Sequence, residues 1–208
     1  LDEFKKIKDK VILGSAIETI KILDNKSYFY SECLKNKLDC SIPFKTYNNY
    51  ESFIIAKENM IKMGYHELCI KPSIGVFASG FHYFSNEDIL KRFTQGSNFA
   101  VTYNEYENAL KNSDYALPEM IIMPKYNGKE ISVDGSCNIY NGKIAMCARV
   151  KIHSVGQKII IDDEIYKISR KIIDIFKLKG IFNIQFMIHD DQYKILEVNA
   201  RPSGGIFY

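Results

Sequence analysis

The sequence lacks most of the features that assign a protein to a functional class at sight. Its five cysteines are odd in number and have no short metal-ligand spacing, which argues against a disulfide framework and a zinc motif. No apolar run is long enough to span a membrane, and no segment has a signal-peptide pattern. We therefore expect reduced, buried thiols in a cytoplasmic protein. The cysteines are Cys33, Cys40, Cys69, Cys137 and Cys147.

The sequence also lacks a strong excess of positive or negative charge. The formal net charge is only +3, and the lysines near the start are interrupted by acidic residues. The chain has no basic stripe of the kind that binds nucleic acid, so neither nucleic acid nor a membrane is an expected partner. No cysteine has an indicated histidine partner, which disfavours catalysis by a side-chain nucleophile.

What remains is an ordinary globular composition, with 46% hydrophobic and 25% charged residues in a chain of 208. That length fits one large domain or two small ones. Helical and strand patterns mix along the chain, and strands dominate after Pro118, which predicts an α+β fold with antiparallel sheets. We expect helices ending near Leu23 and spanning 28–38, 48–63, 86–93, 104–111 and 162–180, and strands at 11–14, 41–46, 68–71, 81–84, 120–123, 130–140 and 143–153.

Several boundaries rest on particular residues. Ser27 is a plausible N-cap for the second helix, and Gly64 and Gly180 are expected to end the helices that precede them. The pair Asn141-Gly142 is a strong hairpin signal between the strands on either side.

The last quarter of the chain is the most informative. Two apolar-alternating strands, around Asn183–Phe186 and from Ile195 onwards, flank the polar turn 189–192. Period-two geometry places Glu197, Asn199 and Arg201 on one face, and Gln185 can point to that face from the first strand. Oxygen ligands beside a cation suit a divalent metal bound to phosphate. The alternative is a surface hairpin with a polar outer side.

Two earlier segments carry weaker signals. Lys71 closes an apolar strand and opens a loop containing Ser73, Gly75, Ser79 and Gly80, where freed backbone amides can hold phosphate oxygens, although the loop does not fit the Walker pattern. Further on, Met123-Pro124-Lys125 breaks into a turn that can offer backbone groups to a purine edge, with Glu130 placed for ribose hydroxyls. Each segment alone also fits an ordinary turn or a solvent-facing strand.

In this order, the Lys71 loop, the segment before Gly128-Lys129-Glu130, and Glu197-Val-Asn-Ala-Arg-Pro-Ser-Gly-Gly resemble the ATP-grasp superfamily. The closest likeness is to carboxylate–amine ligases of the carbamoyl-phosphate-synthase large-chain type, over about residues 24–205. The resemblance implies two α+β subdomains with mainly antiparallel sheets that hold ATP between them. It also implies a remnant of a preceding domain and linker at 1–25, an N-terminal subdomain at 26–118 and a truncated C-terminal subdomain at 119–208.

The resemblance assigns roles residue by residue. Lys26 and Lys71 match the phosphate-contacting basic positions, Met123 to Lys125 match the adenine hinge, and Glu130 matches the ribose-binding acid. Glu197 and Asn199 match magnesium ligands, with Gln185 at a further metal-side position, and Arg201 matches the arginine that stabilises the transferred phosphoryl group. His153 lies near another site position. Lys71 and Arg201 are the expected catalytic residues, and Ser73, Gly75, Ser79 and Gly80 join the ATP-binding set.

Three departures accompany this match. The phosphate-covering loop has only two glycines, with Ile74 and Phe77 where smaller residues are common. The Asp-Lys pair of the family reads Asn25-Lys26 here, and Met123 stands where a glutamate is frequent.

The chemistry implied is ATP-dependent ligation. With Mg²⁺ or Mn²⁺, the enzyme would activate a small-molecule carboxylate as an acyl phosphate for attack by an amine or a thiol. The resemblance is also compatible with a homo-oligomer. Two alternatives remain: a non-catalytic ATP-binding or sensor module of the same fold, and a structural α+β interaction domain without a nucleotide site.

Overall fold

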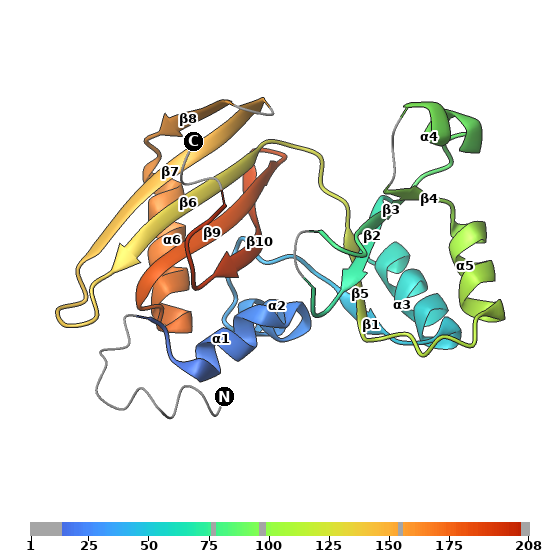
Figure 1. The fold of residues 1–208 in the computed structure, drawn as a ribbon, viewed down its shortest axis with the longest axis horizontal. Helices are drawn as coiled ribbons and strands as arrows, with labels where there is room; N and C mark the ends of the chain where they lie inside the picture. Colours follow the sequence, from blue (N-terminus) through green and yellow to red (C-terminus); the bar gives the residue numbers. More distant parts are fainter. Residues whose placement is uncertain (1–13, 76–77, 96–98, 154–155, 205–208) are drawn as a thin grey trace. The chain divides into compact units, whose positions relative to one another are not determined.

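The computed structural model describes residues 14–75, 78–95, 99–153 and 156–204 (Figure 1). The described chain forms two compact units that are not simply its two halves. Unit 1 holds the described residues of 1–20, 131–184 and 198–208, and unit 2 holds 21–130 and 185–197. Residues 185–197 therefore belong with the earlier part of the chain, although they lie near its end.

Unit 2 is built on a five-stranded sheet with the order β1-β5-β2-β3-β4. Its pairs are antiparallel except for β3 with β4. Helix α3 packs on this sheet with α5 beside it (Figure 1). The elements are α2 (Lys26–Lys35), β1 (Lys45–Tyr47), α3 (Tyr50–Lys62), β2 (Leu68–Pro72), β3 (His82–Phe84), α4 (Ile89–Gln95), β4 (Ala100–Val101), α5 (Tyr103–Asn112) and β5 (Met120–Pro124).

Capping explains where the helices of unit 2 begin. Asn49 and Ser52 form a reciprocal capping box at the start of α3, and Thr102 and Glu105 form another at the start of α5. Gly64 follows α3 with a φ of +92°, a left-handed conformation that favours glycine and confirms the predicted stop.

The core of unit 2 lies between its sheet and α3. Phe53, Met60 and Ile70 are fully buried at the centre of an apolar cluster. Strand β5 is buried along its whole length, because it pairs on both sides, with β1 and β2. This burial keeps the end of β2, which carries Lys71, in a fixed place.

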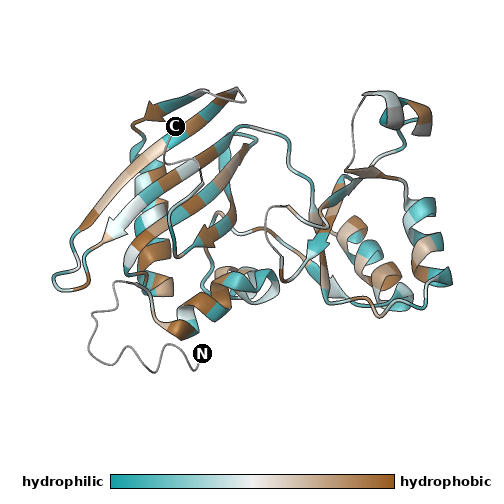
Figure 2. Ribbon diagram, in the orientation of Figure 1, coloured by the Kyte–Doolittle hydropathy of each residue, from teal (hydrophilic) through white to brown (hydrophobic). Residues whose placement is uncertain are grey.

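Unit 1 contains most of the second sheet, whose order is β10-β9-β6-β7-β8. Helix α6 packs against this sheet, and hydrophobic and hydrophilic positions alternate along its strands (Figure 2). The described elements outside the list for unit 2 are α1 (Ile17–Asp24), β6 (Glu130–Cys137), β7 (Ile144–His153), β8 (Gly156–Ile160), α6 (Asp163–Phe176), β9 (Gly180–His189) and β10 (Gln192–Asn199). The α1, β9 and β10 segments each contribute residues to both units.

The expected α+β class and antiparallel pairing are confirmed, and so is the hairpin of β6 and β7. The turn between β9 and β10 has positive φ at Asp190 and Asp191, +49° and +56°. Two such residues match the twist of a tight two-residue hairpin, which is the connection expected there.

Some boundaries were predicted wrongly. Asn25, not Ser27, caps α2, because its side-chain oxygen accepts from the amides of Ser27 and Tyr28. Helix α6 ends at Phe176 with Lys177 in the left-handed conformation, so Gly180 opens β9 and ends no helix.

Other boundaries also differ from the expectation. Helix α4 begins at Ile89, because Asp88 accepts from the amides of Leu90 and Lys91. Strands β4 and β8 were not predicted at all. Strand β10 stops at Asn199, so Arg201 is not on the strand. The strand expected at 11–14 lies outside the described residues except for Gly14, which bridges to Gly180.

The thiols agree with the expectation in all but one case. All five cysteines are free, and four of them are buried. Cys147 is exposed, because it lies on the open side of β7, so the prediction of a buried thiol was wrong there. Within the described helices, none has both the length and the apolar character needed to cross a bilayer.

Candidate functional site

Two lysines and a glutamate form a charged group in unit 2, here called the lysine cluster: Lys26, Lys71 and Glu197. The Nζ of Lys26 donates to the carbonyl of Gly75 at 2.8 Å, and the Nζ of Lys71 donates to the hydroxyl of Tyr30 at 3.0 Å. Burial lowers the pKa of Lys71, and burial together with the charge of Lys71 lowers the pKa of Lys26. Glu197 raises both pKa values, and Asp24 also raises that of Lys26, but neither shift is reversed.

The loop after β2 is tied to the first turn of α2. The backbone amide of Lys26 donates to Ser73 at 2.7 Å, and Asn25 and Ile74 form an isolated β-bridge. The amide of Ser73 donates in turn to the carbonyl of Glu119 at 2.9 Å. The loop therefore runs beside the lysines, which brings together Lys26, Lys71, Ser73 and Gly75 of the predicted phosphate site.

One feature of this loop fits a bound anion, and another restricts its conformation. The Ser73 hydroxyl is buried and has no hydrogen-bond partner among the described residues, an unusual state for a buried polar group. Gly80 has a φ of +71°, and a Cβ there would lie 2.8 Å from the Cγ of Pro72. A larger residue at 80 would thus displace the loop. Ser79 is exposed, and Phe77 lies outside the described residues.

The departure at Asn25 has no structural cost. Its Oδ1 accepts from the Ser27 amide at 3.0 Å, the Ser27 hydroxyl at 2.8 Å and the Tyr28 amide at 3.2 Å. Asparagine and aspartate are equally good N-caps. Asn25 therefore holds Lys26 at the first position of α2 as an aspartate would.

The predicted adenine hinge lies at the end of strand β5. Met123 and Pro124 pair with Cys69 and Leu68 across the β2–β5 ladder, and Met123 is buried. The backbone amide of Lys125 donates to the carbonyl of Glu67 at 2.8 Å, so that amide is already used. The Nζ of Lys125 lies 3.9 Å from the centre of the Tyr83 ring, a cation–π contact.

The turn after the hinge tolerates no side chain at Gly128. A Cβ there would lie 1.8 Å from the carbonyl oxygen of Ile188. The amide of Ile188 also donates to the carbonyl of Lys129 at 3.0 Å, which pins the turn to β9. Glu130, the predicted ribose-binding acid, follows as the exposed first residue of β6.

The predicted metal-side residues lie on β9 and β10. Gln185, Glu197 and Asn199 are all partly buried. Gln185 and Glu197 belong to unit 2 and Asn199 to unit 1. In unit 2, Gln185 and Glu197 supply one amide and one carboxylate, a low charge for a divalent ion unless an anionic ligand adds more. No group of three or more histidine, cysteine, aspartate or glutamate side chains gathers as a metal centre in the described ranges.

A second charged group lies in unit 1, here called the arginine network: Asp134, Arg149, Gln157, Asn183 and Ser203. The guanidinium of Arg149 donates through Nε to Asp134 at 2.5 Å, through Nη2 to Ser203 at 2.6 Å and through Nη1 to Gln157. Asn183 donates to the other oxygen of Asp134 at 3.0 Å. The network joins β6, β7, β8 and β9 to the segment after β10.

Two residues of the predicted site, Arg201 and His153, take part in neither the lysine cluster nor the arginine network in the described hydrogen bonds. Arg201 is exposed, and its Nη1 donates to the carbonyl of Pro202 at 3.1 Å. His153 is the last residue of β7, and its side chain is outside the described part.

The sequence reading missed Tyr30 and the arginine network. Tyr30 lies four residues after Lys26, so both share one face of α2, and that spacing was the available signal. For Arg149 no such signal exists, because its three partners come from three separate segments of the chain.

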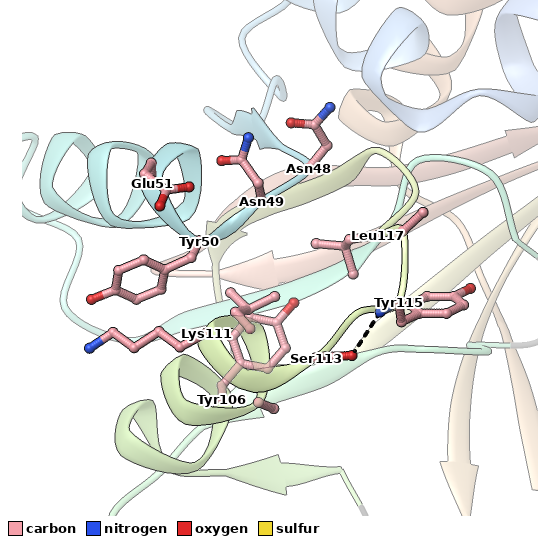
Figure 3. A pocket seen from close by; sticks show the side chains of 12 residues that line it. Asn48, Asn49, Tyr50, Glu51, Tyr106, Lys111, Ser113, Tyr115 and Leu117 are labelled. Atoms are coloured by element: carbon pink, nitrogen blue, oxygen red, sulfur yellow. Dashed lines mark hydrogen bonds between the residues drawn. The ribbon is translucent and has the colours of Figure 1, made fainter.

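A separate hollow of about 550 Å³ lies in unit 2, at the N-terminal end of α3 and the C-terminal end of α5 (Figure 3). Tyr50, Tyr106, Lys111 and Tyr115 are among its lining residues. The Nζ of Lys111 lies 4.6 Å from the centre of the Tyr50 ring. None of the residues predicted to bind ATP or metal lines this hollow.

Comparisons with known proteins support the resemblance. Residues 116–208 match the family described as ATP-grasp in the biosynthetic pathway with Ter operon. The arginine-specific carbamoyl phosphate synthase large chain of Halalkalibacterium halodurans is 25% identical over 205 residues, 92% of this chain and 18% of that protein. The VanG D-Ala:D-Ser ligase of Enterococcus faecalis superposes with a TM-score of 0.65 at 14% identity, covering 91% of this chain and 56% of the ligase.

The chain has the ATP-grasp fold. A second ATP-grasp structure, N5-carboxyaminoimidazole ribonucleotide synthetase in complex with ADP, gives a TM-score of 0.64 at 16% identity, over 89% of this chain and 46% of the synthetase. The chain thus spans about a fifth of the curated relative's length and about half the length of these structures. The predicted resemblance to ATP-grasp proteins and to carbamoyl phosphate synthase large chains is confirmed by these matches, and so is the predicted fold class.

Proposed function

We propose that this protein is an ATP- and Mg²⁺-dependent ligase that joins a carboxylate to an amine or another nucleophile. The observation that carries the proposal is the lysine cluster: two ammonium groups keep lowered pKa values although Glu197 and, for Lys26, Asp24 raise them, and they lie beside a loop whose buried Ser73 hydroxyl has no hydrogen-bond partner among the described residues. Such a site is short of negative charge, and a triphosphate supplies it. The relatives and the solved structures with this fold are synthases, synthetases and ligases.

The residues fit a metal–nucleotide complex. Lys26 and Lys71 would bind phosphate oxygens, with Ser73 and Gly75 as loop donors and Ser79 and Gly80 in the same loop. Met123 to Lys125 would face adenine and Glu130 the ribose, and because the Lys125 amide already donates to Glu67, the hinge donor must be a different amide. Gln185, Glu197 and Asn199 would hold Mg²⁺, and phosphate oxygens would complete their small donor set. When bound, the ion would neutralise charge that develops on the phosphates.

The proposed reaction has two steps. A carboxylate oxygen of the substrate attacks the γ-phosphorus, the bond to the β–γ bridging oxygen breaks, and ADP leaves, giving an acyl phosphate. An amine then attacks the carbonyl carbon, loses a proton and expels inorganic phosphate. Arg201 would stabilise the transferred phosphoryl group, since its guanidinium can donate two parallel hydrogen bonds. His153 would lie beside the same site.

A non-catalytic ATP-binding module is the second candidate. Ile74 favours it mildly, because this large apolar side chain is 71% exposed in the loop that should cover phosphates. Binding of ATP alone does not separate the two candidates, so the test must detect the intermediate.

Acyl-phosphate trapping separates them. The protein is incubated with Mg-ATP, hydroxylamine and a panel of small carboxylic and amino acids, and hydroxamate and ADP are measured. A ligase forms hydroxamate with at least one acid, and Glu197→Gln or Arg201→Ala lowers the rate on the order of 10²–10³-fold. ATP binding without hydroxamate or ADP for any acid would favour the binding module. Wild-type rates in both variants would overturn the assigned roles.

A further inference from the structure

Tyr30 connects two parts of the proposed site through one hydroxyl group. Its side chain is fully buried in α2, and its hydroxyl donates to the carbonyl of Leu196 at 2.6 Å. The same hydroxyl accepts from the Nζ of Lys71 at 3.0 Å. A phenol has one proton to donate, and its lone pairs remain free to accept. The directions of the two hydrogen bonds are therefore compatible, and both can exist at once.

The ring of Tyr30 is held as firmly as its hydroxyl. It packs against Phe29 with ring centres 5.2 Å apart and against Phe44 at 5.6 Å. The Nζ of Lys71 lies 5.2 Å from the centre of the Tyr30 ring, so the ring also contacts the ammonium. Because interiors are closely packed, the hydroxyl has one accessible position.

The carbonyl that Tyr30 binds belongs to the residue directly before Glu197. Strand β10 is fixed in the same neighbourhood by the amide of Ile195, which donates to the carbonyl of Cys40 at 2.9 Å. Tyr30 thus links a phosphate-side lysine on β2 to the backbone of a metal-side strand. All of these residues lie in unit 2.

We infer that Tyr30 is a positioning residue, whose hydroxyl sets the distance between the Lys71 ammonium and the Glu197 segment so that both meet one metal–triphosphate group. The inference rests on the proposed function. Tyr30 acts on the nucleotide through Lys71 and touches neither phosphate nor metal itself. A purely structural tyrosine would satisfy the Leu196 carbonyl without affecting ligand affinity.

Tyr30→Phe tests this role, because it deletes the hydroxyl and keeps the packed ring. Titration calorimetry with Mg-ATP should show a Kd about tenfold higher, the usual scale for one hydrogen bond to a charged group. Tyr47→Phe is the matched control, since Tyr47 is also buried in unit 2 and shares a 2.7 Å hydrogen bond with the Tyr106 hydroxyl. It should lower the Tm comparably while leaving the Kd for Mg-ATP unchanged. A Kd in Tyr30→Phe equal to that of Tyr47→Phe overturns the inference.

A double-mutant cycle with Lys71→Met separates this inference from the proposed function. If Tyr30 acts through Lys71, adding Tyr30→Phe to Lys71→Met leaves the Kd of the single Lys71 variant unchanged. Independent, additive effects would contradict the positioning role while leaving ATP binding intact. If the wild-type protein binds no Mg-ATP, or if Lys71→Met binds it as tightly as wild type, the proposed function itself fails.

Discussion

The two charged groups of this molecule are built in opposite ways. In the arginine network every charge has a partner: Arg149 is bonded to Asp134, Gln157 and Ser203, and Asp134 also accepts from Asn183. In the lysine cluster the two ammonium groups donate to neutral groups of the described residues, the Gly75 carbonyl and the Tyr30 hydroxyl, and each keeps a lowered pKa although nearby carboxylates raise it. One group pairs its opposite charges within the protein, whereas we propose that an anionic ligand completes the other.

This difference separates structure from function. A fully paired buried ion group fixes the fold, and removal of one partner leaves an uncompensated charge. A group of like charges destabilises the free protein, and a ligand of opposite charge removes this repulsion when it binds. Substitutions in the two groups should therefore change different quantities, stability in unit 1 and nucleotide affinity in unit 2.

The largest expected effect on stability comes from Arg149→Met. It leaves the Asp134 carboxylate, which is 8% exposed, with Asn183 as its remaining partner in the network, and should cost about 3–5 kcal/mol. Denaturant unfolding measures the loss. The double variant Arg149→Met with Asp134→Asn should recover part of it, because the stranded charge is gone. Equal stabilities for wild type and Arg149→Met would show that the network is not structural.

Lys71→Met should weaken nucleotide binding without lowering the stability of the ligand-free protein. The Kd for Mg-ATP should rise about 10- to 100-fold through the loss of a charged phosphate contact. The Tm without ligand should stay the same or increase, because a buried like charge beside Lys26 has been removed. Thermal unfolding with and without Mg-ATP measures both quantities in one experiment. A large fall of the ligand-free Tm with normal affinity would place Lys71 among the structural residues.

Ser203→Ala should have a smaller effect on stability. It removes the 2.6 Å hydrogen bond from the Nη2 of Arg149, which is worth about 1 kcal/mol. Urea unfolding at neutral pH should resolve a shift of the midpoint. A loss as large as that of Arg149→Met would mean that Ser203, and not Asp134, dominates the network.

The smallest effect is expected at a partly buried ion pair outside both groups, Arg92 with Glu105. The hydrogen bond from Arg92 lowers the pKa of Glu105 to about 2, from an ordinary value of 4.5. A carboxylate with a depressed folded-state pKa stabilises the protein above its unfolded-state pKa, and this contribution is lost as the pH falls through the folded-state value. The wild-type free energy of unfolding should therefore fall slightly between pH 4.5 and about 2, and in Glu105→Gln this fall should be smaller. An unchanged acid transition in that variant would rule out the pair as its source.

The sequence was sufficient for features encoded by local pattern. Strand patterns and Gly64 predicted most elements of unit 2, although not β4, and the spacing of Glu197 and Asn199 predicted their place on one strand. The errors have local causes. Asn25 and Ser27 are both good caps, and pattern alone does not choose between them. Lys177 took the left-handed position in which glycine was expected, so Gly180 was misread.

The contacts of the site were beyond the sequence. Lys26 and Lys71 were assigned by resemblance. Their burial and the repulsion between their charges depend on a fold that brings α2, β2 and β10 together, and the sequence alone does not show this. The arginine network draws its five residues from segments between positions 134 and 203, and no periodicity marks such a set. Polar networks of this kind are visible only once the chain is folded.

Covalent labelling tests the central claim most directly. An ATP analogue with a reactive acyl group on its terminal phosphate acylates a lysine amine that lies beside the phosphates, and peptide mass spectrometry identifies the labelled residue. We predict labelling of Lys26 or Lys71, blocked by excess Mg-ATP. Labelling that excess Mg-ATP does not block, or labelling confined to lysines elsewhere, such as Lys111 beside the separate hollow, would contradict the account.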